Sequence, residues 1–473
     1  MTEQVLKSNN QRPGLWTLFK QALAGNANQD FTKGSIGVAA FLLAVPMVLE
    51  MLMESIFAIV DMIFVSSLGF EAVAVVGLTE AVLTLIYGVA IGLSMGITAL
   101  VARRIGENDV EDANLIAAQS LWVGLFVATI VALIGLWYAE SILALMGAEE
   151  KVLEIGTDYT TIMMTGSITI LYLFMINAIF RGAGDPSIAM RSLWIANGLN
   201  IVLDPLLIYG IGPFPEMGVT GAAVATNIGR GIGVLYQLYH LRSHLGRIRV
   251  TMAHLPVNLA KIQDIIKVSL GGMAQFLIST ASWVFLVRIV STYGSAAVAG
   301  YTIAIRVIIF TILPAWGMSN AVATLVGQNL GAKQPDRAEE SVWCIAKFNL
   351  YFMLSVAFVF IAFAEHIVGF FSQDKEVVSS GISCLRFIAC GYGFYAVGMI
   401  LIQAFNGAGD TLTPTKINFV CYWLLQIPLA YALAKLLHLD SSGVYIAIML
   451  AESLIALVGY WVFRKGQWKV MQV

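Results

Sequence analysis

The run Phe-Arg-Gly-Ala-Gly-Asp at residues 180–185 returns as Phe-Asn-Gly-Ala-Gly-Asp at residues 405–410, a separation of 225 residues. Two further blocks align at the same offset without a gap. Gly69, Ala72, Val73 and Ala74 match Gly294, Ala297, Val298 and Ala299, and Leu100, Val101 and Gly106 match Leu325, Val326 and Gly331. Chance does not readily produce three blocks at one offset, even in apolar sequence. The chain is therefore predicted to be an internal duplication.

The composition places this duplicated chain in a lipid bilayer. Hydrophobic residues make up 59% of the 473 residues and charged residues only 12%, and the mean hydropathy is +0.82. Soluble globular proteins carry about 45–50% apolar and about 25% charged residues. The net charge of −2 offers no basic surface for nucleic acid. The bilayer is therefore an expected partner, and nucleic acid is not.

Twelve apolar segments are long enough to cross the roughly 30 Å of membrane hydrocarbon, six in each half of the duplication. Because backbone polar groups in lipid must be satisfied internally, each segment is predicted to be a helix. An even number of spans gives both halves the same orientation, as in transporters built from parallel repeats. The predicted fold class is an all-α integral membrane protein with twelve transmembrane helices in two parallel six-helix repeats. The spans lie near residues 35–67, 71–97, 110–136, 152–180, 188–210, 219–241, 265–291, 296–322, 339–364, 376–404, 412–436 and 443–463.

The distribution of Lys and Arg predicts the orientation. The two termini and the even-numbered loops hold 19 of the 27 Lys and Arg residues, and the odd-numbered loops hold 3. By the positive-inside rule, both termini are predicted to be cytoplasmic, in a bacterial plasma (inner) membrane. The expected organisation is an N-terminal segment with an interfacial helix (1–34), a first lobe (35–241), a linker (242–264), a second lobe (265–465) and a cytoplasmic tail (466–473).

The first span carries three acids on one face. Counted from Glu50 at about 100° per residue, Glu54 lies about 40° away and Asp61 about 20° away. Ionisable groups inside a span are costly, and by default they are functional-site hypotheses. Pro46 precedes the three acids and is expected to kink the helix.

A second acidic position lies in the fifth span, where Asn200 and Asp204 are four residues apart and so share a helical face. Asp61 and Asp204 reach a similar depth in the outer half of the first lobe, and Glu80 reaches it from the second span. Carboxylates that converge at low dielectric share a proton or bind a cation, and oxygen ligands suit a hard ion such as Na⁺. The structural alternative is an acid that caps a kink or pairs with Arg230.

The second half of the duplication lacks these acids. At the offset of 225, Leu286 occupies the position of Asp61, and Leu429 occupies that of Asp204. Cation chemistry is therefore predicted for the first lobe only. The charges within spans of the second half are mainly basic: Arg288, Arg306, Lys347 and Arg386, with Glu452 in the last span.

Several short motifs resemble the multidrug and toxic compound extrusion (MATE) family. Leu-Ala-Val-Pro at 43–46 followed by Ile-Val-Asp-Met-Ile-Phe-Val at 59–65 resembles the first helix of the family, and the repeated Gly-Ala-Gly-Asp motif is similar to the one found there. Leu-Asn-Ile-Val-Leu-Asp-Pro at 199–205 is similar to the fifth helix of the DinF-type branch. The NorM-type branch carries second-lobe acids where this chain has Gln275 and Arg386, which favours the DinF-type branch.

The resemblance implies a V-shaped, two-lobed antiporter that exports cationic, amphipathic small molecules in exchange for Na⁺ or H⁺. It assigns the coupling site to Asp61, Asn200 and Asp204, which would be the metal ligands if the ion is Na⁺, with Thr226 as a further member. No cofactor other than the coupling ion is expected, and the protein is expected to be a monomer.

Four more residues are candidates for substrate contact or a proton relay. Tyr159 is a weaker match to the family. Glu50, Glu54 and Glu80 are not carried over from the family, and they are predicted to relay protons or to dock cationic substrates.

Three other classes of protein remain as alternatives. A lipid or lipid-linked oligosaccharide flippase of the same superfamily would use Arg288, Arg306 and Arg386 on phosphate groups. A major-facilitator transporter also has twelve spans, but residues 102–109 do not match its Gly-x-x-x-Asp-Arg loop motif. An enzyme is not expected, because the sequence offers no nucleophile–base pair, metal cluster or phosphate loop.

Overall fold

The computed structural model describes residues 14–25, 29–243 and 246–471, and within these ranges every regular element is a helix. The parts of the predicted N-terminal segment, linker and tail at residues 1–13, 26–28, 244–245 and 472–473 lie outside the described residues. The description below concerns the three described ranges.

A short helix precedes the first span. This helix, α1 (Leu15–Ala24), buries Leu18 and Ala22 and leaves Leu15 and Trp16 exposed. An exposed apolar edge on a short helix is typical of a segment that lies on a membrane surface, and that position stays a prediction.

Each predicted span is a helix, a helix pair or, in one case, a run of four helical segments, and the order along the chain is as predicted. The first lobe holds α2 (Ile36–Ser66), α3 (Phe70–Gly106), α4 (Val110–Leu145), the pair α5 (Glu150–Thr165) and α6 (Ser167–Ala183), α7 (Pro186–Ile208) and α8 (Gly218–Arg242). The second lobe holds α9 (Leu259–Val290), α10 (Ser295–Gly331), α11 (Pro335–Phe371), the pair α12 (Lys375–Cys390) and α13 (Tyr392–Gly407), a composite span from Leu412 to Leu436, and α16 (Asp440–Arg464).

Two of these spans are irregular. The composite span begins as α14 (Leu412–Asn418), continues as the π-helix η3 (Phe419–Gln426) and the α-helix α15 (Ile427–Tyr431), and ends as the π-helix η4 (Ala432–Leu436). The pair α12 and α13 is bent by 58°. Short 3₁₀ turns occupy Met252–His254 (η1), Ser291–Tyr293 (η2) and Gln467–Val470 (η5).

Hydropathy alone supports most of these spans. Nine helical segments of the described chain are long and apolar enough to cross a membrane, and the bent pair makes ten. The remaining two, α7 and α8, have 23 and 25 residues and pack closely against each other. Their lower hydropathy reflects polar side chains buried inside the lobe, such as Asn200 and Asp204 on α7 and Arg230 and Gln237 on α8.

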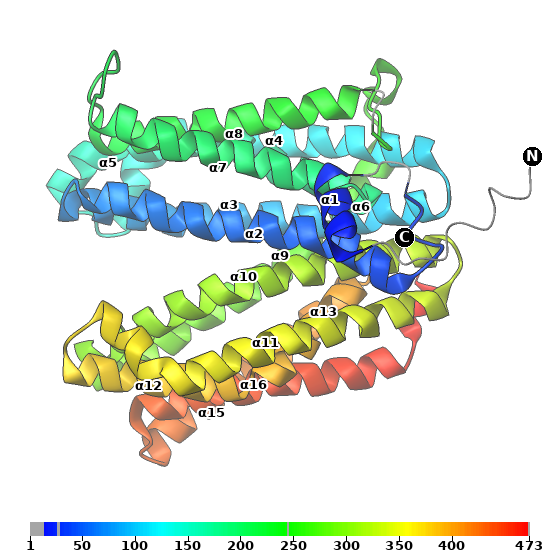
Figure 1. Cartoon of the computed structure of the whole chain (residues 1–473). Helices are drawn as coiled ribbons and strands as arrows, with labels where there is room; N and C mark the ends of the chain where they lie inside the picture. Colours follow the sequence, from blue (N-terminus) through cyan, green and yellow to red (C-terminus); the bar gives the residue numbers. More distant parts are fainter. Residues whose placement is uncertain (1–13, 26–28, 244–245, 472–473) are drawn as a thin grey trace, which may run out of the picture.

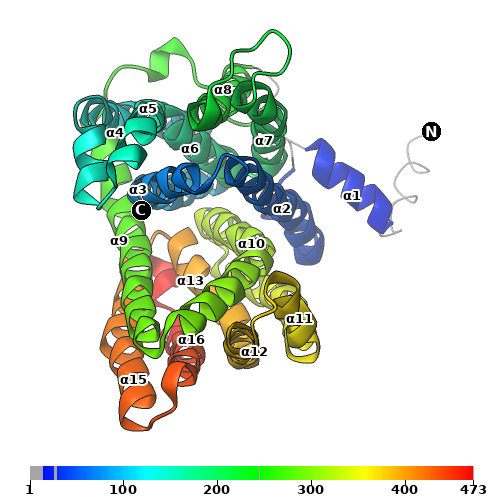
Figure 2. The same cartoon turned by 90° about the vertical axis from the view of Figure 1, so that its left-hand side faces the viewer.

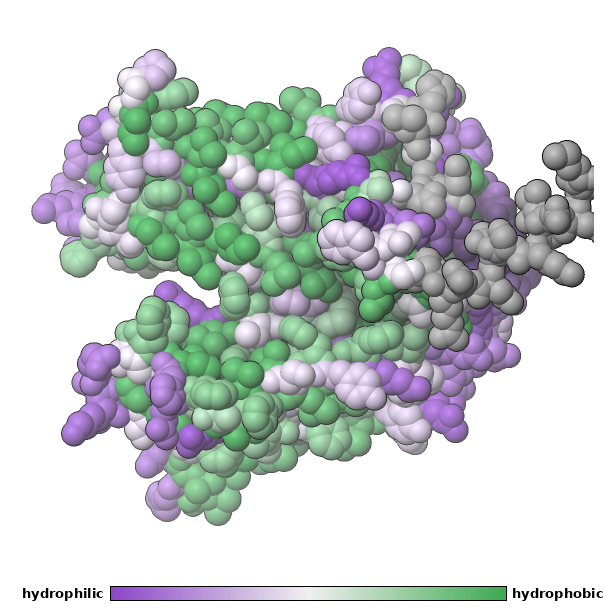
Figure 3. Space-filling model, in the orientation of Figure 1, coloured by the Kyte–Doolittle hydropathy of each residue, from purple (hydrophilic) through white to green (hydrophobic). Residues whose placement is uncertain are grey.

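The two lobes form a V. Figure 1 shows them meeting at the end where α1 and the end of α16 lie and diverging toward the opposite end. Figure 2 looks into the open end, where α2 and α3 of one lobe face α9 and α10 of the other. The notch between the lobes is open in the space-filling view, and its outer flanks are largely hydrophobic (Figure 3).

Glycines and the repeated motif hold the closed end together. Helix α3 approaches α9 so closely at Gly92 that a Cβ there would lie 2.7 Å from the Met273 Cα, which is the close backbone approach that small residues permit in membranes. From α10, Thr324 and Gln328 donate hydrogen bonds to the carbonyls of Arg181 (3.0 Å) and Gly182 (2.9 Å). The Gly-Ala-Gly-Asp motif of the first lobe is thus part of the contact between lobes.

The motif requires glycine for a local reason as well. Gly184 ends α6 with a φ of +89°, and its repeat counterpart Gly409 has a φ of +86°. Residues with a Cβ rarely adopt this left-handed conformation, so the duplicated glycine ends equivalent helices in both lobes.

Candidate functional site

Asp204, Asn200 and Thr226 form a polar cluster between α7 and α8. Asp204 is 0% exposed and Asn200 is 2% exposed. The Asn200 amide satisfies both neighbours when its nitrogen faces Asp204: it then donates to Asp204 Oδ2 at 2.7 Å, and its oxygen accepts from the Thr226 N–H at 3.0 Å and hydroxyl at 2.9 Å. The i,i+4 spacing that predicted a shared face therefore brings these two side chains into contact.

One carboxylate oxygen of this cluster has no hydrogen-bond partner in the described ranges. Asp204 Oδ1 is buried and has no hydrogen-bond partner among the described residues. A buried acceptor without a partner is costly, and it is a place where a proton or a cation can be bound.

Asp61 approaches the cluster from α2. Its side chain is partly exposed, and it lies within electrostatic reach of Asp204. The two acids that the sequence predicted to meet in the outer half of the first lobe are therefore electrostatic neighbours. At this low dielectric their repulsion is reduced when a cation or a proton is bound between or upon them.

Arg230 is the basic group of this region. It is buried in α8, and its Nη2 donates to the Tyr87 hydroxyl at 2.9 Å. The guanidinium carbon lies 5.9 Å from the centre of the Tyr87 ring. Arg230 is within electrostatic reach of Asp61, Glu54 and Glu80, so it partly compensates the acids without forming a close pair with any one of them.

Glu80 and Tyr159 border the same cluster. Glu80 on α3 is exposed, and Tyr159 on α5 is 4% exposed. Tyr159 lies within electrostatic reach of Glu80, Asp61 and Arg230. The structure therefore brings both residues to the outer acidic cluster.

Glu54 and Glu50 have other partners. Asn197 on α7 donates to Glu54 Oε2 at 3.0 Å. Glu50 is 2% exposed, accepts a hydrogen bond from Asn177 at 3.0 Å, and lies 3.9 Å from the Arg181 guanidinium. The single acidic face predicted for α2 thus serves two groups of partners, and Glu50 belongs to the one that includes Arg181 of the repeated motif.

Several polar partners were not identified in the sequence. Gln237 Nε2 donates to Asn177 Oδ1 at 2.6 Å, and the Ser192 hydroxyl donates to the same oxygen at 3.1 Å. A usable signal existed for α7, since Asn197, Asn200 and Asp204 follow the i, i+3, i+7 spacing of one helical face. No such local signal exists for residues on different helices.

Pro46 lies in an uninterrupted α2. The helix runs from Ile36 to Ser66, and Pro46 is buried within it. Helix α10 approaches α2 next to it, because a Cβ on Gly317 would lie 2.6 Å from the Met47 carbonyl oxygen. The predicted kink stays a prediction.

The outer cluster offers only oxygen ligands. The described residues contain no group of three or more His, Cys, Asp or Glu side chains close enough to hold a metal ion. A cation here would be held by the carboxylates of Asp61 and Asp204, with Asn200 and Thr226 orienting Asp204. Carboxylate oxygens suit Na⁺ or a proton and no soft transition metal.

Comparisons with known proteins match nearly the whole chain. The family model MatE matches residues 46–206 and 272–432, one segment in each half of the duplication. A probable multidrug resistance protein NorM from Thermotoga maritima is 27% identical over 90% of this chain and 92% of its own length. A FAD transporter from Shewanella oneidensis is 26% identical over 86% of this chain and 90% of its own length. A solved structure of a multidrug resistance MATE family transporter in an outward-facing conformation has a TM-score of 0.86 and 28% identity, covering 92% of this chain and 96% of that chain.

Proposed function

Since the chain belongs to the MatE family of transporters, we propose that this multi-pass membrane protein is a multidrug efflux antiporter that exports cationic, amphipathic compounds in exchange for Na⁺ or H⁺. The observation that carries the proposal is the outer cluster of the first lobe. There the buried, unpartnered oxygen of Asp204 lies beside Asn200 and Thr226 and within electrostatic reach of Asp61.

The proposed mechanism is alternating access by rocking of the two lobes. With the V open at the end opposite to the termini, Asp61 and Asp204 take up the inward-moving cation, which favours release of the drug. With the V open at the other end, the cation leaves, and the freed carboxylates attract a cationic substrate. Coupling requires that each ligand bind the two states with different affinity.

The proposed location is the bacterial inner membrane, with both termini in the cytoplasm. The excess of Lys and Arg in the termini and even-numbered loops supports this orientation. The open notch of the V (Figure 3) then faces outward.

The proposed substrate is a cation because acids outnumber bases around the outer cluster. A flippase for phosphate-bearing lipids would need the arginines of the second lobe to converge on one cavity. Instead Arg288 and Arg306 are exposed, and Arg386 lies 3.5 Å from Glu365. These positions favour the antiporter over the flippase.

Transport into inside-out vesicles tests the proposal, because export from the cell corresponds to uptake into the lumen of such vesicles. A gradient of Na⁺ or of H⁺ is imposed across the vesicle membrane, one at a time, and ethidium uptake into the lumen is followed. We expect uptake to respond to one of the two gradients. If uptake responds to neither gradient, the protein is not a cation-coupled antiporter.

A further inference from the structure

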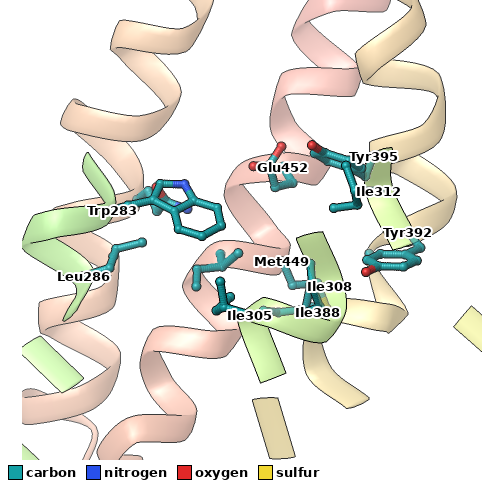
Figure 4. Close-up of a pocket in the computed structure, with 13 residues that line it drawn as sticks. Trp283, Leu286, Ile305, Ile308, Ile312, Ile388, Tyr392, Tyr395, Met449 and Glu452 are labelled. Carbon is teal, nitrogen blue, oxygen red and sulfur yellow. The ribbon is translucent and has the colours of Figure 1, made fainter. Parts of the chain in front are cut away.

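The second lobe contains a partly open pocket that the proposed coupling site does not use. It is surrounded by α9, α10, α12, α13, η3 and α16. Figure 4 shows Glu452 and Tyr395 at one level of the pocket, Trp283 opposite to them, and a floor of aliphatic side chains. The floor is formed by Leu286, Ile305, Ile308, Ile388 and Met449.

The pocket presents two hydrogen-bond acceptors. The Tyr422 hydroxyl donates to Glu452 Oε1 at 3.0 Å. Gln426 is 1% exposed, and its Oε1 has no hydrogen-bond partner in the described part of the chain. No basic side chain of the described ranges forms an ion pair with Glu452, whose only polar partner there is Tyr422. A carboxylate in such an apolar setting requires a proton or a cation.

The backbone is irregular where these groups meet. Tyr422 and Gln426 both lie on η3, and Gln426 is its last residue. Pro428 follows two residues later and has no N–H to donate. π-Helical segments frequently occur at functional sites, and here η3 places Gln426 in the lining of the pocket and Tyr422 against Glu452.

The duplication relates this pocket to the outer cluster of the first lobe. At the offset of 225, Leu286 in the pocket corresponds to Asp61, and Glu452 corresponds to Asn227, the residue after Thr226. The same place in the repeat therefore has small oxygen ligands in the first lobe. In the second lobe it has aromatic walls and a single carboxylate.

We infer that this second-lobe pocket binds the head of a lipophilic ammonium ion that carries at least one N–H. Glu452 supplies the opposite charge, and Gln426 Oε1 accepts the N–H. Trp283, Tyr392 and Tyr395 line the pocket with aromatic rings, and such rings attract organic cations. Binding of an ammonium ion in this pocket does not depend on the proposed function. Only the statement that this ligand is one of the exported compounds rests on it. The inference differs from the prediction that cation chemistry is confined to the first lobe.

The test is direct binding to the purified full-length protein in nanodiscs, measured by calorimetry. The probes are 2-(naphthalen-1-yl)ethylammonium and its N,N,N-trimethyl analogue, which has the same charge and no N–H. We expect the primary ammonium to bind more tightly, and Glu452→Gln to weaken it at least about tenfold, as for the loss of a charge-assisted hydrogen bond. Gln426→Met is expected to abolish the preference for the primary ammonium.

Three further variants serve as controls for this binding experiment. Glu365→Gln removes an exposed carboxylate of the same lobe and should bind like the wild type. Ile312→Trp fills the pocket from α10 and should weaken binding while Glu452 is retained, which covers the case in which Glu452→Gln does not fold. The difference in affinity between Glu452 and Glu452→Gln should persist in an Asp204→Asn background even where transport is lost, so a failure of the proposed antiport does not remove the pocket.

Two results would overturn the inference. One is wild-type affinity in folded Glu452→Gln or in Ile312→Trp. The other is an effect of Glu452→Gln that disappears in the Asp204→Asn background, which would place the ligand in the first lobe.

Discussion

Asp204 combines deep burial with an unsatisfied oxygen. Its Oδ2 accepts from Asn200, while Oδ1 has no partner in the described ranges. A structural carboxylate would be expected to have both oxygens satisfied or a close basic partner. The basic group of this region, Arg230, is within electrostatic reach of Asp61, Glu54 and Glu80 and is bonded to Tyr87, and it forms no close pair with Asp204. This arrangement is better explained by an ion that comes and goes than by a permanent pair.

Asp61→Asn and Asp204→Asn are each expected to abolish gradient-driven ethidium efflux, because an amide keeps the shape of the side chain but removes the charge that we propose binds the coupling ion. The measurement is ethidium loss from energised cells with matched expression. Asp158→Asn, an exposed acid of α5 in the same lobe, is the control and should export normally. Unimpaired efflux in both site variants would contradict the coupling site.

The Glu50 group makes a prediction about stability. Glu50 and Arg181 are both buried and lie 3.9 Å apart. Removing one member of a buried pair leaves the other charge uncompensated, at a cost of roughly 3–5 kcal/mol. Arg181→Met should therefore lower the melting temperature clearly.

The double variant Glu50→Gln with Arg181→Met identifies the cause of that loss. It removes both charges, so it should be more stable than Arg181→Met alone in a thermal shift assay on detergent-solubilised protein. A double variant no more stable than the single variant would show that the ion pair does not account for the loss. The cause would then be the lost packing of the Arg181 side chain or a disturbed hydrogen bond from Thr324 to the Arg181 carbonyl.

At the scale of elements, hydropathy and turn residues were enough to predict the spans, because length and apolar character are local properties. The irregularities were not predictable in this way. The π-helices of the composite span and the 58° bend between α12 and α13 arise within continuous apolar sequence. In such sequence, prolines and glycines such as Pro428 and Gly391 are the local hints of a break.

The site was partly predictable for the same reason. Asn200 and Asp204 share a face through simple helix periodicity, and they do interact. Thr226 was assigned to the candidate site only through the family resemblance. The contact between Arg230 and Tyr87 joins residues 143 positions apart, and helix periodicity has no bearing on pairs that far apart.

Gly92 and Gly77 on α3 provide a matched test of helix packing. A Cβ on Gly92 would overlap the backbone of Met273 in α9, whereas a Cβ on Gly77 meets nothing within 4 Å. Gly92→Ala should destabilise the contact between lobes by about 1–3 kcal/mol. Gly77→Ala should stabilise α3 by up to about 1 kcal/mol, because alanine favours helix more than glycine does.

Melting temperatures of the two variants in the same detergent check this prediction. Opposite shifts are expected. Equal shifts would mean that α3 and α9 do not rely on the close approach at Gly92.

At the scale of the whole molecule, the duplication gives both lobes the same helical scaffold, while the polar side chains inside the two lobes differ. Both lobes end equivalent helices with a left-handed glycine, and α10 of the second lobe bonds to the motif of the first through Thr324 and Gln328. The lobes meet at one end and diverge at the other (Figure 1). If the lobes rock, the contacts at the closed end must break during each cycle.

A disulfide across the closed end tests that requirement. A Cβ on Gly327 of α10 would lie 2.7 Å from the Ala102 Cβ of α3, so a small outward shift reaches the roughly 3.5–4.5 Å of disulfides. The double variant Ala102→Cys with Gly327→Cys is made after replacing the four native cysteines, Cys344, Cys384, Cys390 and Cys421.

Oxidation of this double variant should abolish ethidium efflux, and a reductant should restore it, because the cross-link holds the V open at one end only. Ala102→Cys alone, in the same background, should be insensitive to oxidation. A rigid pore, or a carrier that moves within one lobe, would not need the lobes to separate. Full ethidium efflux by a completely cross-linked sample would therefore exclude rocking of the lobes as the transport step.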